Sequence, residues 1–286
     1  MEKLTVTLKT ITPVFLGGAD GKTPELRAPS IKGAMRFWWR AMNGDLSIEE
    51  LRNKEGALFG SSDEGVGRSK FALKIICNSN LKTNSYKPVP TKTFTAQAFV
   101  PEQDFTLLLT ANRRFKEFEM ICDVLKVSLL LGGLGKRSRR GFGSLEIGKP
   151  APPQCNSIED LFKILDLTKP DTFVLNGDKI EKIKPAHVEA EYPYIKEIEI
   201  GKAPASWEVL INKIGAAASV HDCYHTGFAD PYRFASPIYV SVIKKNNGQC
   251  LPIITTLHCA FKESVDNLKN AKKRIDNTQK FKDAIL

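Results

Sequence analysis

The sequence predicts an α+β protein built from tandem ferredoxin-like units, of which the second is incomplete or rearranged. Residues 1–149 follow the order strand, helix, strands, helix, strand, which is the βαββαβ order of a ferredoxin-like domain. The segment Pro150-Ala151-Pro152-Pro153 is typical of a boundary, because proline lacks a backbone N–H and ends regular structure. Residues 188–286 then contain a second series of strand and helix patterns. We therefore expect domains over 1–149 and 188–286, joined by a connector with a short helix over 150–187.

The first strand and the first helix are predicted from their apolar periodicity. Residues 3–11 alternate polar and apolar side chains, as a half-buried strand does. Ser30 is a suitable cap for a helix that extends to about Asn43. The apolar residues of this helix recur at intervals of three and four. We therefore expect Trp38 and Trp39 to lie in the core rather than to stack on bases.

The same periodicities predict the rest of the first unit. Strands are expected over 70–76 and 105–109, with a less regular extended segment over 93–100. A strongly apolar pattern predicts a helix over 113–131, which a glycine pair then ends. A short strand over 144–147 completes the unit.

The second unit shows similar patterns but lacks two parts of the first. A short helix over 158–165 precedes it. We expect an extended segment near 194–200, a helix over 207–214, a hairpin of 237–243 with 251–259, and a basic amphipathic helix over 263–282. The sequence predicts neither a final strand nor a second glycine-rich loop after this helix. For that reason we expect the second unit to be an incomplete or rearranged copy.

The composition indicates a folded protein with a polyanionic partner. The 286 residues, 42% of them hydrophobic, are enough to bury a sizeable core. The formal net charge of +10 and the pI near 9.2 favour nucleic acid first and a membrane surface second. The first residues alternate like a strand rather than a signal peptide, and no apolar run reaches the length of a membrane span. We therefore expect a cytoplasmic protein without a membrane segment.

The loop over residues 133–143 is the most informative motif in the chain. Two glycine pairs enclose four cations, in the order Gly133, Gly135, Lys136, Arg137, Arg139, Arg140, Gly141 and Gly143. Glycine permits a close approach of backbone amides to an anion, and Lys and Arg supply charge, so the loop predicts a phosphate-binding site. The alternative is an ordinary exposed basic turn. The loop is not a Walker motif, because Arg137 stands where Ser or Thr is required, nor a dinucleotide fingerprint, because Ser138 replaces the third glycine.

The start of the first helix forms the other half of the predicted site. Amides near residues 31–33 lie at a helix N-terminus, where the helix dipole favours a phosphate, and Lys32 adds a full charge. Gly33 leaves room for a close approach of the backbone. Arg36 and Arg40, four residues apart, continue the line of cations along the helix. In the loop, Phe142 either stacks on a base or packs inward, and the sequence favours neither.

The sequence predicts no metal and no cofactor. His221 and His225 flank Cys223, and on a helix this spacing would supply two metal ligands, but no second cluster completes such a site. A histidine can also act as a general acid or base in metal-independent RNA cleavage. Catalysis by His221 or His225 is therefore kept as an alternative.

Five motifs together resemble a known family. They are Thr12-Pro13-Val14-Phe15-Leu16-Gly17-Gly18, the run from Arg27 to Arg40, Leu58-Phe59-Gly60-Ser61 with Gly67-Arg68-Ser69, the glycine-rich loop, and Arg233-Phe234-Ala235-Ser236-Pro237. Each motif alone is weak evidence. In combination they resemble the RAMP superfamily, and within it the family that forms the first subunit of type III-B CRISPR Cmr complexes.

This resemblance implies RRM-like domains and a non-catalytic role in a ribonucleoprotein of antiviral RNA silencing. The expected partners are single-stranded guide RNA (crRNA) near its 3′ region, target RNA, and other Cmr subunits. RNA contacts are carried onto the first unit and the adjoining cleft, at Lys32, Gly33, Arg36, Arg40, Arg68, Gly133, Gly135, Lys136, Arg137, Arg139, Arg140, Gly141, Phe142, Gly143 and Arg233. Besides the endonuclease, the other alternative is a purely architectural cap that binds partner subunits.

Overall fold

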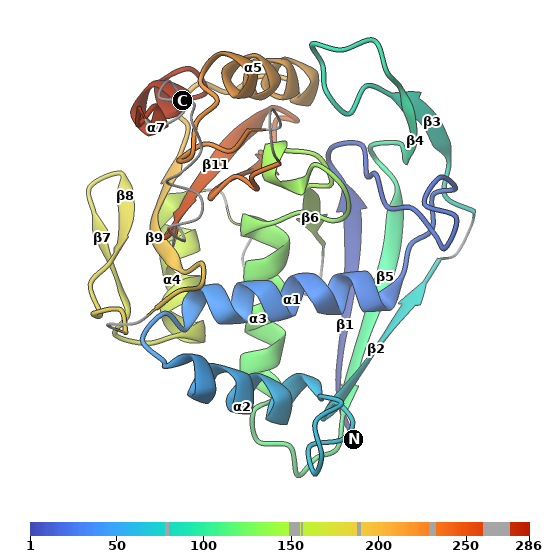
Figure 1. The fold of residues 1–286 in the computed structure, drawn as a ribbon. Helices are drawn as coiled ribbons and strands as arrows, with labels where there is room; N and C mark the ends of the chain where they lie inside the picture. Colours follow the sequence, from blue (N-terminus) through green and yellow to red (C-terminus); the bar gives the residue numbers. More distant parts are fainter. Residues whose placement is uncertain (78–79, 149–154, 156, 188–189, 229–232, 260–274) are drawn as a thin grey trace.

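The described part of the chain contains two larger antiparallel sheets, with helices packed between and around them, and a separate two-stranded sheet (Figure 1). The computed structural model describes residues 1–286 except 78–79, 149–154, 156, 188–189, 229–232 and 260–274. Within these ranges, no helix combines the length and the apolar character needed to cross a membrane.

The first sheet has the predicted ferredoxin-like topology. Its strands are β1 (Glu2–Thr10), β2 (Phe71–Ile76), β5 (Asp104–Ala111) and β6 (Leu145–Ile147), in the order β2-β5-β1-β6. All neighbours are antiparallel, and the first strand lies between the third and the fourth strands, as in a βαββαβ unit. The fold class of the first unit is thereby confirmed.

The two predicted helices of this unit are present, with shifted starts. Helix α1 spans Ala28–Met42, and Pro29 stands in its first turn, a position that suits proline because its missing N–H has no partner there. The prediction that Ser30 caps the helix is therefore wrong. Helix α3 spans Phe118–Leu131 and begins five residues later than expected.

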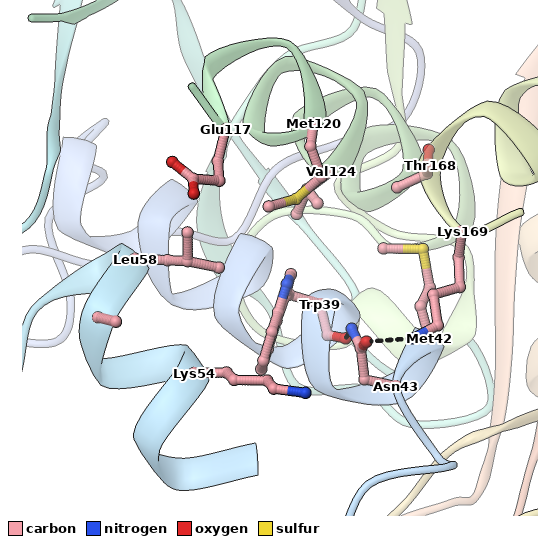
Figure 2. Close-up of a pocket in the computed structure, with 11 residues that line it drawn as sticks. Trp39, Met42, Asn43, Lys54, Leu58, Glu117, Met120, Val124, Thr168 and Lys169 are labelled. Carbon is pink, nitrogen blue, oxygen red and sulfur yellow. Dashed lines mark hydrogen bonds between the residues drawn. The ribbon is translucent and has the colours of Figure 1, made fainter. Parts of the chain in front are cut away.

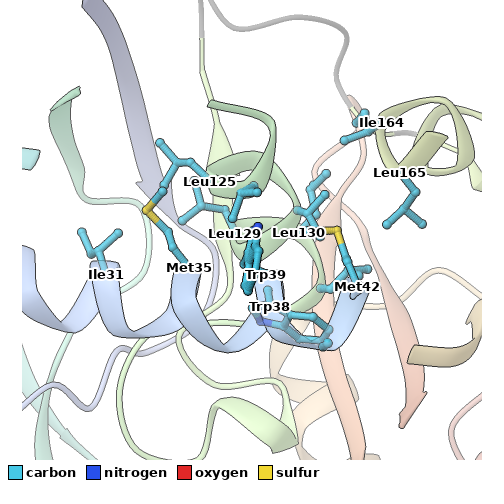
Figure 3. Close-up of a cluster of buried hydrophobic side chains, with 14 of the residues drawn as sticks. Ile31, Met35, Trp38, Trp39, Met42, Leu125, Leu129, Leu130, Ile164 and Leu165 are labelled. Carbon is cyan, nitrogen blue, oxygen red and sulfur yellow. The ribbon is translucent and has the colours of Figure 1, made fainter. Parts of the chain in front are cut away.

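The apolar face of α1 forms the centre of the core. Trp38 and Trp39 are 1% and 5% exposed, so the prediction that both lie in the core is confirmed. Figure 3 shows the residues that meet there, Ile31, Met35, Trp38, Trp39 and Met42 of α1 with Leu125, Leu129, Leu130, Ile164 and Leu165. Because this cluster joins α1 to α3 and to α4 (Ile158–Thr168), it fixes the position of α1.

The sequence did not lead us to expect helix α2 (Ile48–Phe59) or strand β3 (Thr83–Tyr86). Strand β3 forms a hairpin with β4 (Ala96–Phe99), around which an extended segment was expected. Helix α2 begins with a capping box, in which Ser47 Oγ accepts from the Glu50 N–H and Glu50 accepts from the Ser47 N–H. This Ser-x-x-Glu pattern is a recognised start of a helix, so the sequence contained the information needed to find α2.

The second sheet confirms a rearranged unit. Strands β9 (Ile195–Ile200), β10 (Ile238–Lys244) and β11 (Cys250–Leu257) take the places of the first three ferredoxin strands, and α5 (Trp207–Val220) connects β9 to β10. The place of the fourth strand, next to β9, is occupied by β8. Because β8 precedes β9 in the chain, the copy is rearranged and not merely shortened.

The segment predicted as a connector also contributes to this sheet. Besides α4 it contains a hairpin of β7 (Phe173–Asn176) and β8 (Lys179–Lys182), which pairs with β9. The domain boundaries themselves stay a prediction. The predicted helix over 263–282 lies largely outside the described residues, and within them α7 spans Thr278–Asp283.

Candidate nucleic-acid interface

The glycine-rich loop is hydrogen-bonded to both units of the chain. On the side of the first unit, the Lys136 N–H donates to the Phe15 carbonyl at 2.7 Å and the Gly143 N–H donates to the Pro13 carbonyl at 3.0 Å. Towards the second unit, the Gly141 N–H donates to the Val240 carbonyl of β10 at 2.7 Å. These amides are already paired within the protein, so they are not the phosphate ligands that the sequence predicted.

Arg140 contacts the second unit and is not on the surface. It is 8% exposed, and its guanidinium donates to the carbonyls of Thr226 at 2.6 Å and Ile238 at 3.2 Å. Burial, with the nearby charges of Arg137 and Arg139, lowers the pKa of Arg140 to about 9. The expectation that Arg140 contacts a phosphate is therefore corrected to a structural role between the two units.

Phe142 and the glycines on either side of it, Gly141 and Gly143, are also buried. Phe142 is 3% exposed and packs edge-on against Phe15, with ring centroids 5.1 Å apart, so inward packing is the observed alternative. A Cβ on Gly143 would lie 2.0 Å from the Leu134 carbonyl oxygen, and φ at Gly143 is +72°. Glycine is required here for the close approach of two protein segments, which corrects the assignment of Gly141, Phe142 and Gly143 to RNA binding.

The other three cations of the loop, Lys136, Arg137 and Arg139, are less buried than Arg140. Lys136 is exposed, and its Nζ donates to the Gly21 carbonyl at 3.0 Å. Arg137 has a left-handed backbone and donates from Nε to the Pro88 carbonyl at 2.9 Å, and burial lowers its pKa. Since only Lys136 among the four is exposed, the loop is not an ordinary solvated turn either.

Arg139 links the loop to an aromatic surface. Its guanidinium lies 4.8 Å from the ring centroid of Tyr239 and 5.9 Å from that of Phe37. It also donates to the Ser236 carbonyl, within the fifth sequence motif. The charge of Arg139 is thus held beside two aromatic rings, an arrangement that stabilises a cation.

On α1, the predicted cations meet a carboxylate that the sequence did not reveal. Arg36 Nε and Arg40 Nη1 both contact Glu55 Oε1, at 2.5 and 2.6 Å. Glu55 belongs to α2, which explains why it was missed. The two arginine side chains remain 35% and 36% exposed, and each uses one nitrogen on Glu55, so other N–H groups of each fork can still face an anion.

Lys32 continues this line towards the start of α1. Its Nζ lies 5.1 Å from the ring centroid of Phe71, and partial burial, with the charge of Arg36, lowers its pKa. Residues 32, 36 and 40 are four apart and share one stripe of the helix, whereas 30, 34 and 37 share another. Gly33 is exposed between the two stripes, and apart from the adjacent backbone of its own helix no atom lies within 4 Å of where its Cβ would be.

A pocket of about 300 Å³ brings α1 and the glycine-rich loop together. Helix α1 contributes residues on the second stripe, and the loop contributes the stretch from Gly133 to Ser138. The lining includes Ser30, Ala34, Phe37, Gly135, Ser138 and Tyr239. Helix α1 and the loop thus meet at this pocket, but of the predicted site residues only Gly133 and Gly135 line it, and the cations of α1 do not.

Arg68 and Arg233 are not among the residues that line this pocket. Arg68 is exposed in the connection from α2 to β2 and pairs as an isolated bridge with Gly60. Arg233 is exposed and borders residues 229–232, which lie outside the described part. Neither residue lines the pocket, and both stay predictions as RNA contacts.

A second pocket, of about 380 Å³, lies among α1, α2, α3 and the end of α4 (Figure 2). Trp39, Met42 and Leu58 form apolar parts of its lining, with Lys54 and Glu117 also present. This mainly apolar lining does not suit a polyanion, so the pocket is not part of the candidate interface.

The histidine pair does not have the helical geometry required of paired ligands. Helix α5 ends at Val220, so His221 and His225 both lie beyond it, in a turn-rich segment. His225 Nδ1 lies 3.9 Å from Asp276 Oδ2. Among the residues that the structure describes, no group of three or more His, Cys, Asp or Glu is placed to hold a metal ion.

Comparisons with known proteins agree with the motifs. Residues 7–146 match the RAMP superfamily. CRISPR system Cmr subunit Cmr1-2 of Pyrococcus furiosus is 29% identical over 175 residues, covering 49% of this chain and 92% of that relative. Cmr subunit Cmr1-1 of the same organism is 30% identical over 217 residues, covering 65% of this chain and 62% of that relative. The chain thus matches less than two thirds of Cmr1-1.

Solved structures share the fold over the whole chain. Apo Cmr1 from Pyrococcus furiosus superposes with a TM-score of 0.62 and 20% identity, over 100% of this chain and 96% of that one. A chain of the type III-B Cmr-beta complex bound to cognate target RNA gives a TM-score of 0.56 and 14% identity, over 99% of each chain. At these identities the likeness establishes the architecture.

Proposed function

Because the chain contains a RAMP domain over residues 7–146 and is related to the Cmr1 subunits of type III-B CRISPR systems, we propose that it is a non-catalytic RNA-binding subunit of such an effector complex. Its ligand is single-stranded RNA, either the 3′ region of the guide, the target, or both. Its protein partners are other Cmr subunits. A related chain belongs to a complex solved with target RNA, which supports RNA as the ligand.

The observation that best supports this proposal is the meeting of α1 with the glycine-rich loop at one pocket. Both elements that form the pocket also carry cations, Arg36 and Arg40 on α1 and Lys136 on the loop. An RNA strand would place phosphates on the outer N–H groups of the α1 arginines and on Lys32. It would cross the helix at Gly33, where no side chain projects, and reach the pocket on the other side. Such phosphate contacts position RNA without reading its sequence.

The test uses two exposed cations, Lys136, whose side chain makes one hydrogen bond to the Gly21 carbonyl, and Arg68. In a double variant, Lys136→Ala with Arg68→Ala, affinity for unrelated single-stranded RNAs should fall to a similar degree for each. Each lost phosphate contact should also reduce the slope of log affinity against log salt by about 0.7. Fluorescence anisotropy of a labelled RNA at several salt concentrations measures both effects. Lys163→Ala, which removes an exposed cation from α4, is the matched control.

Three outcomes would change the proposal. An unaltered salt slope in the double variant would remove Lys136 and Arg68 from the RNA path. Specific RNA fragments on a denaturing gel, if they disappear in His221→Ala or His225→Ala, would overturn the non-catalytic part. Absence of RNA binding at low salt, combined with tight association with partner subunits, would favour the architectural cap.

A further inference from the structure

The pocket between α1 and the glycine-rich loop has walls unlike those of a phosphate site. Phe37, Trp38 and Tyr239 line it together with the small side chains of Ser30, Ala34 and Ser138. The three rings contact one another, with centroid separations of 5.0 to 5.4 Å. Phe37 is only partly buried, whereas Trp38 and Tyr239 are buried, so Phe37 is the ring with surface left to offer.

The dimensions and polar groups of the pocket fit one flat heteroaromatic group. A volume of about 300 Å³ is at the lower end of the range for small-molecule sites, which suits a ligand as small as one base. The hydroxyls of Ser30, Ser138 and Tyr239 in the lining can both donate and accept hydrogen bonds, and that of Tyr239 already has Arg139 as a partner. The guanidinium of Arg139, 5.9 Å from the Phe37 ring, adds a positive charge beside this wall. An aromatic wall with adaptable hydroxyls favours base stacking with little preference for sequence.

We propose that this pocket receives one unstacked base of the single-stranded RNA, and that Phe37 is the residue on which the base stacks. The inference rests on the proposed function, because the neighbouring cations on α1 and Lys136 would hold the sugar-phosphate chain on either side. The glycine-rich loop then has a defined part in binding. It forms one wall of the base pocket through Gly133, Gly135 and Ser138, while its buried part holds the two units together.

The test separates binding of the base from binding of the backbone. Two labelled RNAs of roughly ten nucleotides are compared, one intact and one in which the central nucleotides lack their bases. The wild-type full chain should bind the intact RNA about tenfold more tightly than the abasic RNA. Ala34→Phe, which fills the pocket without a change of charge, should remove this preference and leave affinity for the abasic RNA unchanged. Phe37→Leu, which keeps an apolar side chain, should reduce the preference in the same direction.

The control and the contradicting results are distinct from those of the proposed function. Ala216→Phe adds the same ring at an exposed position of α5 outside the pocket and should retain the wild-type preference. If both pocket variants keep the full preference for intact RNA, the base pocket is wrong although RNA binding stands. If the wild-type protein binds neither RNA at low salt, the proposed function fails together with the inference.

Discussion

The Arg140 guanidinium donates a hydrogen bond of 2.6 Å to the main-chain carbonyl of Thr226, and this contact joins the glycine-rich loop to the second unit. A second bond from the same guanidinium reaches Ile238 at the start of β10. The basic loop over residues 133–143 therefore has two parts with different surroundings. Its last arginine faces inward, and Lys136 faces solvent.

Arg140→Ala should destabilise the folded protein. Removal of the guanidinium takes a donor from the buried carbonyls of Thr226 and Ile238, although Ile238 still accepts from the Ser236 hydroxyl, and loss of buried, charge-assisted hydrogen bonds costs about 2–4 kcal/mol. Denaturant unfolding followed by circular dichroism measures the loss. Lys136→Ala is the control within the same loop, and it should change the free energy of unfolding by less than about 0.5 kcal/mol while it weakens RNA binding. Equal stability of the two variants would contradict the division of the loop.

The sequence predicted the fold better than it predicted the site, and the loop shows why. Periodicity in residues 3–11, 28–42 and 118–131 reports directly on burial, so those elements were found with small errors at their ends. An arginine in a basic run gives no such information, because burial of Arg140 depends on carbonyls 86 and 98 residues away in the chain. Glu55, which pairs with two predicted arginines, was missed for a related reason. Its distance from Arg36 is set by the packing of α2 on α1.

The same substitution at two glycines should have opposite effects on stability. At Gly135, φ is +85° and an added Cβ would lie 2.2 Å from the Phe15 carbonyl oxygen, so Gly135→Ala should cost more than about 2 kcal/mol. At Gly33, in the exposed part of α1, an added Cβ would have no atom within 4 Å apart from the adjacent backbone of its own helix, so Gly33→Ala should raise stability by about 0.5–1 kcal/mol. Thermal unfolding of both variants tests the pair. A Gly135→Ala protein as stable as wild type would show that the loop can move away from Phe15.

Glu55→Ala should destabilise the protein and disturb the α1 cations. Glu55 is 7% exposed and pairs with Arg36 and Arg40, so its removal leaves two half-buried guanidinium groups close together without a counter-charge. We expect a loss of about 1–3 kcal/mol in the free energy of unfolding. Asp63→Ala breaks the exposed pair with Arg52 and should have a small effect, because water screens such pairs. If both variants unfold at the same denaturant concentration, Glu55 does not organise the arginines of α1.

The stability of the C-terminal helix α7 should depend on pH through Lys282. This residue is 1% exposed and donates to Glu197 and Glu199 of β9. Burial by itself would lower the pKa of Lys282, but its bonds to the two carboxylates outweigh burial and raise it. Burial likewise opposes ionisation of Glu197, and the bond from Lys282 overcomes it and lowers the pKa of that carboxyl below 4.5.

The pKa shifts of Glu197 and Lys282 each stabilise the folded protein over a defined pH range. The contribution of Glu197 is complete above its unfolded pKa near 4.5 and is lost as pH falls through the lower folded value. The contribution of Lys282 is complete below 10.5 and is lost as pH rises through the higher folded value. Lys282→Met should therefore reduce the free energy of unfolding at neutral pH, and the difference from wild type should shrink as pH falls below about 4. Denaturant unfolding of both proteins at neutral and acidic pH measures this difference, and Lys202→Met, which breaks an exposed pair with Asp178, is the control. A difference between wild type and Lys282→Met that stays constant with pH would show that the ionisation of Glu197 is not coupled to Lys282.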